Sequence, residues 1–316
     1  MSVAGAFRAQ AASCDALGSP FMARLLGLLA ERLGPDGAVG ARLHAWPGDM
    51  SARGDAVPLR LAAGLNALVI EGRDAGLAAV WGGQATGDAA LWAAVAAALD
   101  RHGDFLLDWL NRAPQTNEVA RSAALIVSAH WLAAEVKLPL VLSELGASAG
   151  LNLLFDHWRL EVAGVGLGPA RAPVVLRPAW DGPLPPAGRL SVIARAGVDL
   201  HPRDPVADRT ALTAYVWADQ SARLARLSAA LDAAARLRPP VARGDAIDWL
   251  EERLATPRPG AVHLIYHTVF WQYLPEAARP GARRFWPGLG PAPRRRHRSR
   301  IWKWRQTAPA TARRCI

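Results

Sequence analysis

Hydrophobic positions recur with a helical period through almost all of the first 137 residues. Three apolar faces are formed by Phe21, Leu25, Leu28 and Leu29, by Leu59, Leu61, Leu65, Leu68 and Ile70, and by Leu91, Trp92, Val95 and Leu99. Spacings of three and four residues place such side chains on one side of a helix. Runs typical of strands are scarce in this part of the chain. The pattern therefore predicts an all-helical N-terminal region over residues 1–137.

A different pattern, short apolar runs separated by glycine and acidic residues, occupies residues 138–282. The runs are residues 140–142, 174–176, 191–194 and 262–266, and helical candidates lie at 221–237 and 246–254. Strands that alternate with helices are typical of a parallel sheet with crossover helices. A proline-rich passage around residues 169–186 has the composition of an inserted loop. We expect an α/β domain with a doubly wound, mostly parallel sheet over residues 138–282.

The charge of the chain is concentrated at its C-terminal end. The 316 residues carry a formal charge of +10, and 51% of them are hydrophobic, which is typical of a globular protein. Residues 283–316 hold ten arginines, one lysine and no acidic residue, which leaves 26 of the 37 basic residues against 27 acidic ones. The body of the protein is therefore near neutral, and its charge does not indicate a nucleic-acid partner.

Two explanations fit the basic segment 283–316. Its arginines with Trp302 and Trp304 are suited to hold phosphates and stack on bases, so nucleic acid is an expected partner only if this segment is genuine. Alternatively, an acid-free, Arg/Pro/Ala/Gly-rich end is what a shifted reading frame near residues 280–285 of a GC-rich gene would produce. We favour the frame shift and expect a disordered tail. Translation of the other two frames tests this, because one of them should restore strand-patterned sequence.

Neither a metal site nor a membrane segment is expected. Cys14 and Cys315 lie at opposite ends of the sequence, so no disulfide framework or cysteine metal site is indicated. His263 and His267 fall on a predicted strand, where residues four apart are separated by roughly 13 Å, too far for one ion. No uninterrupted apolar stretch of about 18 residues and no signal-type N-terminus is present. We therefore expect a cytoplasmic protein without a membrane partner.

The segment 140–153 has the pattern of a buried strand, a glycine turn and a helix, and it admits two functions. Gly146-Ala147-Ser148-Ala149-Gly150 fits the G-x-S-x-G nucleophile turn of α/β-hydrolases. The matching triad would be Ser148, then Asp199 or Asp245, then His267. However, the region upstream is helical and contains no loop suited to bind an oxyanion. This leaves a serine hydrolase as an alternative.

The second interpretation is a cofactor loop, because Glu144 precedes Gly146 by two residues and Gly150 follows, as in the first motif of class I S-adenosylmethionine-dependent methyltransferases. Two further predicted strands end in Asp199 and Asp245, which are suited to accept hydrogen bonds from ribose hydroxyls and from the adenine amino group. Each carboxylate has a local alternative, since aspartates also cap turns and helices. The expected cofactor contacts are Glu144, Gly146, Ser148, Gly150, Asn152, Asp199 and Asp245.

Four segments together resemble a bacterial family known as domain of unknown function 2332. These segments are residues 115–121, 144–152, 197–202 and 243–246, and the similarity covers about residues 18–280. The resemblance implies a Rossmann-like core similar to class I methyltransferases after a helical region, and S-adenosylmethionine as the candidate cofactor. It implies no established reaction. About fifty residues separate Gly146 from Asp199, where about twenty are usual, so an insertion must fill that gap.

Candidates for the substrate side of the site are Glu118, Arg121 and His267. Residues 115–121 open a predicted helix with Thr116 or Asn117 as N-cap, and Glu118 and Arg121 with Asn117 lie within one turn. His267 ends the fourth predicted strand, where a neutral imidazole is suited to accept a proton. Local pairing of the first group and structural burial of His267 are the alternatives. The leading hypothesis is methyl transfer to an unknown small-molecule acceptor, and a non-catalytic nucleotide-type binding module is the runner-up.

Overall fold

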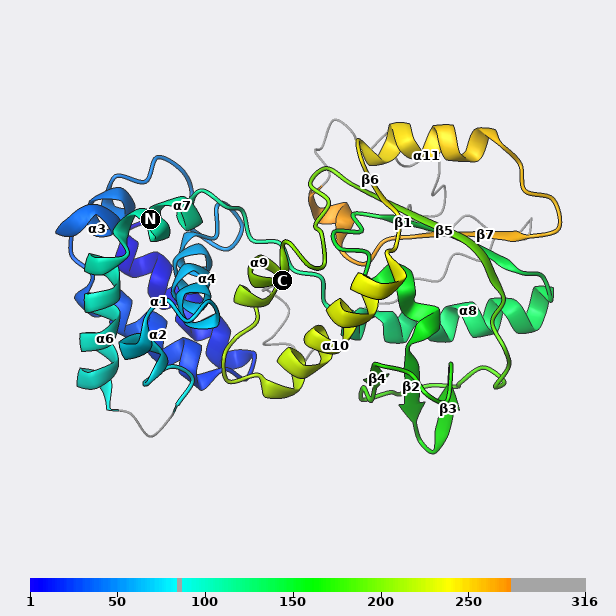
Figure 1. The fold of residues 1–316 in the computed structure, drawn as a ribbon, viewed down its shortest axis with the longest axis horizontal. Coiled ribbons are helices and arrows are strands. Elements are labelled where there is room, and N and C mark those ends of the chain that lie inside the picture. Colours follow the sequence, from blue (N-terminus) through cyan, green and yellow to red (C-terminus); the bar gives the residue numbers. More distant parts are fainter. Residues whose placement is uncertain (84–86, 274–316) are drawn as a thin grey trace. The chain divides into compact units, whose positions relative to one another are not determined.

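The computed structural model describes residues 1–83 and 87–273, and the chain forms two compact units (Figure 1). Unit 1 contains residues 1–116 and 208–225, and unit 2 contains residues 117–207 and 226–273 of the described chain. Neither unit is continuous in sequence. The first division falls at residue 116, and the helix over residues 122–136, which the hydrophobic pattern grouped with the N-terminal region, belongs to unit 2.

Unit 1 is built from helices. They are α1 (Val3–Ala16), α2 (Pro20–Arg32), α3 (Gly37–His44), α4 (Val57–Ile70), α5 (Ala75–Ala78), α6 (Asp88–Arg101), α7 (Gly103–Leu110) and α9 (Arg209–Ala214). Ser2, Ser19 and Asp74 accept hydrogen bonds from first-turn amides of α1, α2 and α5, as N-caps do. The predicted helical character of this region is confirmed.

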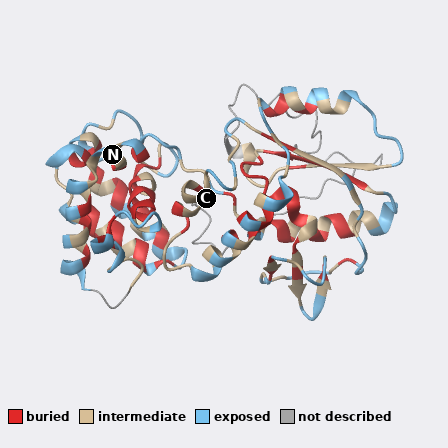
Figure 2. Cartoon of the chain, in the orientation of Figure 1, coloured by how far each residue is buried: buried red, intermediate tan, exposed pale blue. Residues whose placement is uncertain are grey.

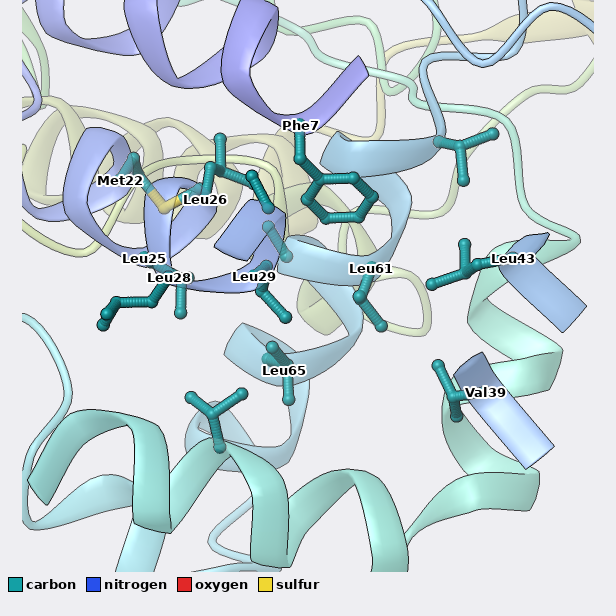
Figure 3. Packing of buried hydrophobic residues seen from close by; sticks show 14 of the residues in the cluster. Phe7, Met22, Leu25, Leu26, Leu28, Leu29, Val39, Leu43, Leu61 and Leu65 are labelled. Atoms are coloured by element: carbon teal, nitrogen blue, oxygen red, sulfur yellow. The ribbon is translucent and has the colours of Figure 1, made fainter. Parts of the chain in front are cut away.

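The predicted apolar faces form the core of unit 1. Phe7, Leu26 and Leu29 pack beside Leu61 and Leu65 of α4 (Figure 3), and α4 is buried along most of its length (Figure 2). Ile70 differs from the prediction, since it lies at the end of α4 with 42% of its surface exposed.

A later segment of the chain, residues 208–225, completes this helical unit. The Asn66 amide donates to the carbonyl oxygens of Ala214 and Val216, at 3.0 and 3.2 Å, and its oxygen accepts from Trp81 Nε1 at 2.9 Å. Buried amides are stable only when paired in this way. The segment is therefore held by specific polar contacts, which hydrophobic periodicity does not reveal.

Unit 2 contains a four-stranded parallel sheet. Its strands are β1 (Leu140–Leu145), β5 (Val192–Asp199), β6 (Val241–Arg243) and β7 (Val262–Tyr266), in the order β6-β5-β1-β7. This confirms the predicted α/β class with a parallel sheet. The run at 174–176 was predicted with these strands but contributes β4 (Val175–Leu176) to a separate three-stranded sheet, with β2 (Arg159–Val162) and β3 (Val165–Leu167).

Helices α8 (Ser122–Val136) and α11 (Ala246–Ala255) lie on opposite sides of the parallel sheet, and α10 (Ser221–Leu237) precedes β6 (Figure 1). Val119–Val136 is the one described stretch with the length and apolar composition of a membrane-crossing helix, a test that core helices also pass, and 39% of it is buried. It packs against η2 (Asn152–His157). The expected absence of a membrane partner stays a prediction.

The connection from β1 to β5 contains no long helix. It consists of the short 3₁₀ helix η2, the small sheet β3-β2-β4 and the proline-rich passage. The expected insertion is therefore present, whereas the helix expected after Gly150 is only a kinked 3₁₀ segment. The helix expected to open at residues 115–121 and to run towards Val136 begins later, since η1 (Val119–Arg121) follows Glu118, which caps it in place of Thr116 or Asn117, and α8 continues from η1.

Candidate functional site

Two carboxylates lie on one face of the sheet where β1 and β5 end. Glu144 is paired in register with Gly197, and Asp199 lies two residues further along β5. Side chains two residues apart in a strand share a face, so Asp199 projects on the same side as Glu144. A Cβ at position 197 would lie 2.6 Å from Ala147 Cβ. Glycine at 197 thus lets the loop after β1 fold across the end of β5.

The backbone amides of this loop are engaged within the protein. Gly146 N and Ala147 N donate to Val198 O at 2.9 and 3.1 Å, and Ser148 N donates to Asp199 Oδ2 at 2.8 Å. Gly150 N donates to Ala147 O at 2.7 Å. Phosphate-binding loops present such amides to the ligand instead. These four donors are unavailable, so the turn is poorly suited to bind a phosphate.

The loop needs its two glycines for conformation and for space. Gly146 and Gly150 have φ of 68° and 71°, where side chains are disfavoured. A Cβ on Gly146 would lie 3.1 Å from Phe270 Cβ, and one on Gly150 would lie 2.8 Å from Pro239 Cγ. Ser148 also has a positive φ, 51°, although it is not glycine. Ala56, Lys137, Ala163 and Arg238 share a positive φ, so the conformation of Ser148 permits a functional turn without identifying one.

Glu144 is enclosed by the protein. Its exposed fraction is 1%, and its Oε2 atom has no hydrogen-bond partner among the described residues. Burial raises the pKa of Glu144 well above its ordinary value, and the nearby charge of Asp199 raises it further, whereas the charge of Arg121 lowers it. The fold therefore favours the neutral form of this carboxyl group.

A buried hydrogen-bond network of polar side chains holds the loop that follows β1. Asn117 Nδ2 donates to Ala147 O at 2.9 Å, and Asn152 Nδ2 donates to Asn117 Oδ1 at 2.9 Å. Ser122 Oγ donates to Asn152 Oδ1 at 2.8 Å, and the Tyr266 hydroxyl donates to Asn152 O at 3.2 Å. Asn152, expected as a cofactor contact, thus has its side chain engaged inside the protein and helps to hold the loop.

The candidates before β1 separate into two environments. Glu118 Oε1 accepts from Ala120 N at 3.0 Å and from Arg226 of α10 at 3.2 Å, so it both caps η1 and pairs with another helix. Arg121 lies near enough to Glu144 to influence its ionisation. The structure therefore places Arg121 near Glu144 and engages Glu118 in the local contacts that were its alternative.

Asp199 and Asp245 both hold backbone amides. Asp199 Oδ1 accepts from His201 N at 2.9 Å, while its Oδ2 holds Ser148, and each oxygen keeps a further lone pair for another donor. Asp245 is exposed, and its Oδ1 caps α11 by accepting from Ile247 N at 2.7 Å. Gly244 N donates to Asp199 O at 3.1 Å, which brings the end of β6 beside the end of β5.

Two histidines belong to the region of β7, His263 within the strand and His267 directly after it. His267 lies directly after the strand, its ring centroid is 6.0 Å from that of Phe270, and burial lowers its pKa. His263 Nε2 lies 2.7 Å from Ser143 Oγ, which also accepts from Arg253 Nε at 2.5 Å. This cluster on the α11 side of the sheet was not predicted from the sequence. Over the described residues, no group of three His, Cys, Asp or Glu side chains could hold a metal ion.

One family model matches residues 4–296, and its description is "Uncharacterized protein conserved in bacteria (DUF2332)". No curated protein and no solved structure matches the chain. The match ends inside the basic segment 283–316, which lies outside the described residues, and the frame shift near residues 280–285 stays a prediction.

Proposed function

The chain belongs to this bacterial family, DUF2332, whose description names no reaction, and we propose from its site that it binds S-adenosylmethionine and transfers the methyl group to a small-molecule acceptor. Counted along the sequence, β1, β5, β6 and β7 are strands one to four of the parallel sheet, and their spatial order is 3-2-1-4. Doubly wound nucleotide-binding sheets begin with that order. The order supports a Rossmann-like core.

The observation that carries the proposal is the combination of a carboxylate pair with a loop whose amides are already engaged. Glu144 and Asp199 share one face at the carboxyl ends of adjacent strands, the edge where ligands bind in open α/β sheets. S-Adenosylmethionine carries positive sulfonium and ammonium groups and no phosphate. Dinucleotides and nucleoside triphosphates require free amides or cations at this turn. The site therefore fits S-adenosylmethionine better than a phosphate-containing nucleotide.

The residues present fit this cofactor in distinct roles. Asp199 retains acceptor capacity for ribose hydroxyls, and Asp245, two residues after the neighbouring strand β6, is available for the adenine amino group. Bound S-adenosylmethionine supplies an activated methyl group. The protein would contribute chiefly alignment of acceptor and methyl donor, and His267, which burial keeps neutral, is suited to take a proton from the acceptor.

Calorimetric titration of the full chain with S-adenosylmethionine and S-adenosylhomocysteine tests the proposal. We expect binding of both, and a loss of about tenfold or more in the Asp199→Ala variant, since a lost charged hydrogen bond is worth about 1.5–3 kcal/mol. Asp100→Asn, an exposed aspartate of α6, is the matched control. Absence of binding at millimolar ligand would contradict the proposal. Binding without methyl transfer to any acceptor would favour the non-catalytic module.

A second candidate, a serine hydrolase, is favoured by one specific observation. Ser148 has φ of 51° in a G-x-S-x-G turn directly after a buried strand, the setting of a nucleophile turn. Against it, Ser148 is only 5% exposed and Asp199 binds its backbone amide. Covalent labelling by a fluorophosphonate probe, lost in Ser148→Ala, would establish the hydrolase and overturn the methyltransferase.

A further inference from the structure

Glu144 is a buried carboxyl group, and its protonation state must change if the site binds a cationic ligand. It is 1% exposed, and its Oε2 atom has no hydrogen-bond partner among the described residues. An ionised carboxylate is costly to bury unless a positive charge compensates it, so it is either neutral or paired.

Charged and titratable groups face Glu144 from three elements. Arg121 approaches from η1, Asp199 from β5 and Tyr266 from β7. Asp199 repels a negative charge on Glu144, Arg121 attracts one, and burial is the largest influence, so the pKa of Glu144 is raised. Burial also raises the pKa of Tyr266, which keeps its proton and bonds to Asn152 O. Without a ligand, the environment favours the neutral acid.

An ion pair between Arg195 and Asp156 acts on Tyr266, and neither residue is among the groups that shift the pKa of Glu144. Arg195 binds Asp156 through two hydrogen bonds of 2.6 and 2.8 Å. The charge of Asp156 raises the pKa of Tyr266, and the charge of Arg195 lowers it. Arg121 is therefore the cation that acts on Glu144, and Arg121 is half-buried rather than fully enclosed. A second positive charge brought by a ligand would shift the balance toward the carboxylate.

We propose that Glu144 is the neutral acid of the ligand-free site and becomes the counter-ion of a positively charged centre in the bound nucleoside, with loss of its proton to solvent. This rests on the proposed cofactor site. In the step, the O–H bond of the carboxyl group breaks, its electron pair stays on the carboxylate, and water or buffer takes the proton. The charge of the ligand does not change.

The proposal defines a class of ligand by charge. S-Adenosylmethionine has a sulfonium and an ammonium group, S-adenosylhomocysteine has only the ammonium group as a positive centre, and 5′-methylthioadenosine has neither. The first two also carry the amino-acid carboxylate. Charged ligands should bind with proton release and more tightly as pH rises through the titration of Glu144. The uncharged nucleoside should show neither effect. Comparing the first two ligands identifies which positive centre Glu144 serves.

The test is calorimetry of the full chain in two buffers with different ionisation enthalpies, which gives the protons released per ligand bound. We expect a release approaching one proton for a charged ligand, none for 5′-methylthioadenosine, and none in Glu144→Gln. Glu252→Gln, which removes an exposed carboxylate of α11, should retain the wild-type release. No release from the wild type, or an equal release from Glu144→Gln, overturns the proposal.

A second measurement does not depend on any ligand. Infrared spectra of the ligand-free protein near neutral pH should contain a carbonyl band of a protonated carboxyl group in the wild type and in Glu252→Gln, but not in Glu144→Gln. Its absence from the wild type overturns the neutral-acid assignment. If the band is present and no ligand binds, the proposed cofactor and the counter-ion role fail, and the neutral acid stands. Circular dichroism verifies that each variant is folded.

Discussion

Glu144 shows how one residue acquires its chemistry from its position in the fold. In the sequence it is an acidic residue two positions before a glycine, whereas in the structure it lies on a fully buried strand between Gly197 and Tyr266. Burial separates the carboxyl group from water and raises its pKa. Its acid–base behaviour is therefore a property of the sheet and not of the local motif.

The first prediction concerns the pH dependence of stability. Below the ordinary pKa of about 4.5, Glu144 is protonated in both states and contributes no slope. Above it, the unfolded chain loses the proton that the folded protein keeps, so the free energy of unfolding falls as pH rises until the folded pKa is reached. The slope is at most about 1.4 kcal/mol per pH unit.

Glu144→Gln should remove this slope, which urea unfolding at a series of pH values between 4.5 and 8 measures. Glu252→Gln should keep the wild-type slope, because its carboxyl group is exposed. If Glu144→Gln and the wild type lose stability in parallel as pH rises, the burial argument is wrong.

At the scale of elements, the loop between β1 and η2 is determined by positive φ angles and close packing. Gly146 and Gly150 are recognisable in the sequence as residues that permit a tight turn, and the structure adds the reason that they cannot be alanine. The polar network through Asn117 and Asn152 joins segments separated by 35 residues. No local pattern predicts such a pairing, because each asparagine by itself is equally compatible with a cap or a surface.

The second prediction separates the two glycine requirements. Gly150→Ala should destabilise unit 2 by more than the roughly 1–2 kcal/mol that a left-handed backbone costs a side chain, because its Cβ would also lie 2.8 Å from Pro239 Cγ. Gly164→Ala is the matched control, since its φ is 78° and nothing lies within 4 Å of the added Cβ. Urea unfolding compares them, and equal losses would show that packing at Gly150 is unimportant.

At the scale of the whole molecule, neither compact unit is a continuous stretch of chain. Unit 1 takes residues 208–225 from the connection between β5 and β6, and it holds them through Asn66 and through Asp219, which accepts from Ser19 Oγ at 2.5 Å and from Phe21 N at 3.0 Å. The hydrophobic pattern predicted the N-terminal helices and the helix at 221–237. The unit to which residues 208–225 belong is instead set by polar contacts with residues distant in sequence.

The third prediction tests this organisation. Asn66→Ala leaves Trp81 Nε1 and two carbonyl groups without their partner, so it should destabilise unit 1 by about 1–3 kcal/mol. Hydrogen exchange followed by mass spectrometry should show faster exchange in residues 208–220 together with residues 57–81. Exchange in β1 should stay unchanged. Confinement of the effect to residues 57–81 would contradict the discontinuous unit.

The sequence by itself determined the kinds of element and their order. Helical periodicity fixed the N-terminal helices, and the alternation after residue 138 indicated a parallel sheet. Its strands end at or within two residues of Glu144, Asp199, Asp245 and His267. These features are local, since side-chain period and turn residues depend on neighbours in the chain. The strands β2 and β3 were missed because they are only three or four residues long, and the run at 174–176, predicted as a strand of the parallel sheet, pairs with β2 instead.

Only the tertiary structure decided how those residues act. It placed Glu144 with Arg121 and Asp199, engaged Asn152 and Glu118 in internal contacts, and paired Ser143 with His263 and Arg253. Burial, register and hydrogen-bond partners arise between segments far apart in sequence, where one pattern is compatible with several partners. A motif thus located the site at the end of β1, and the environment supplied by β5, β7 and η1 set its charge.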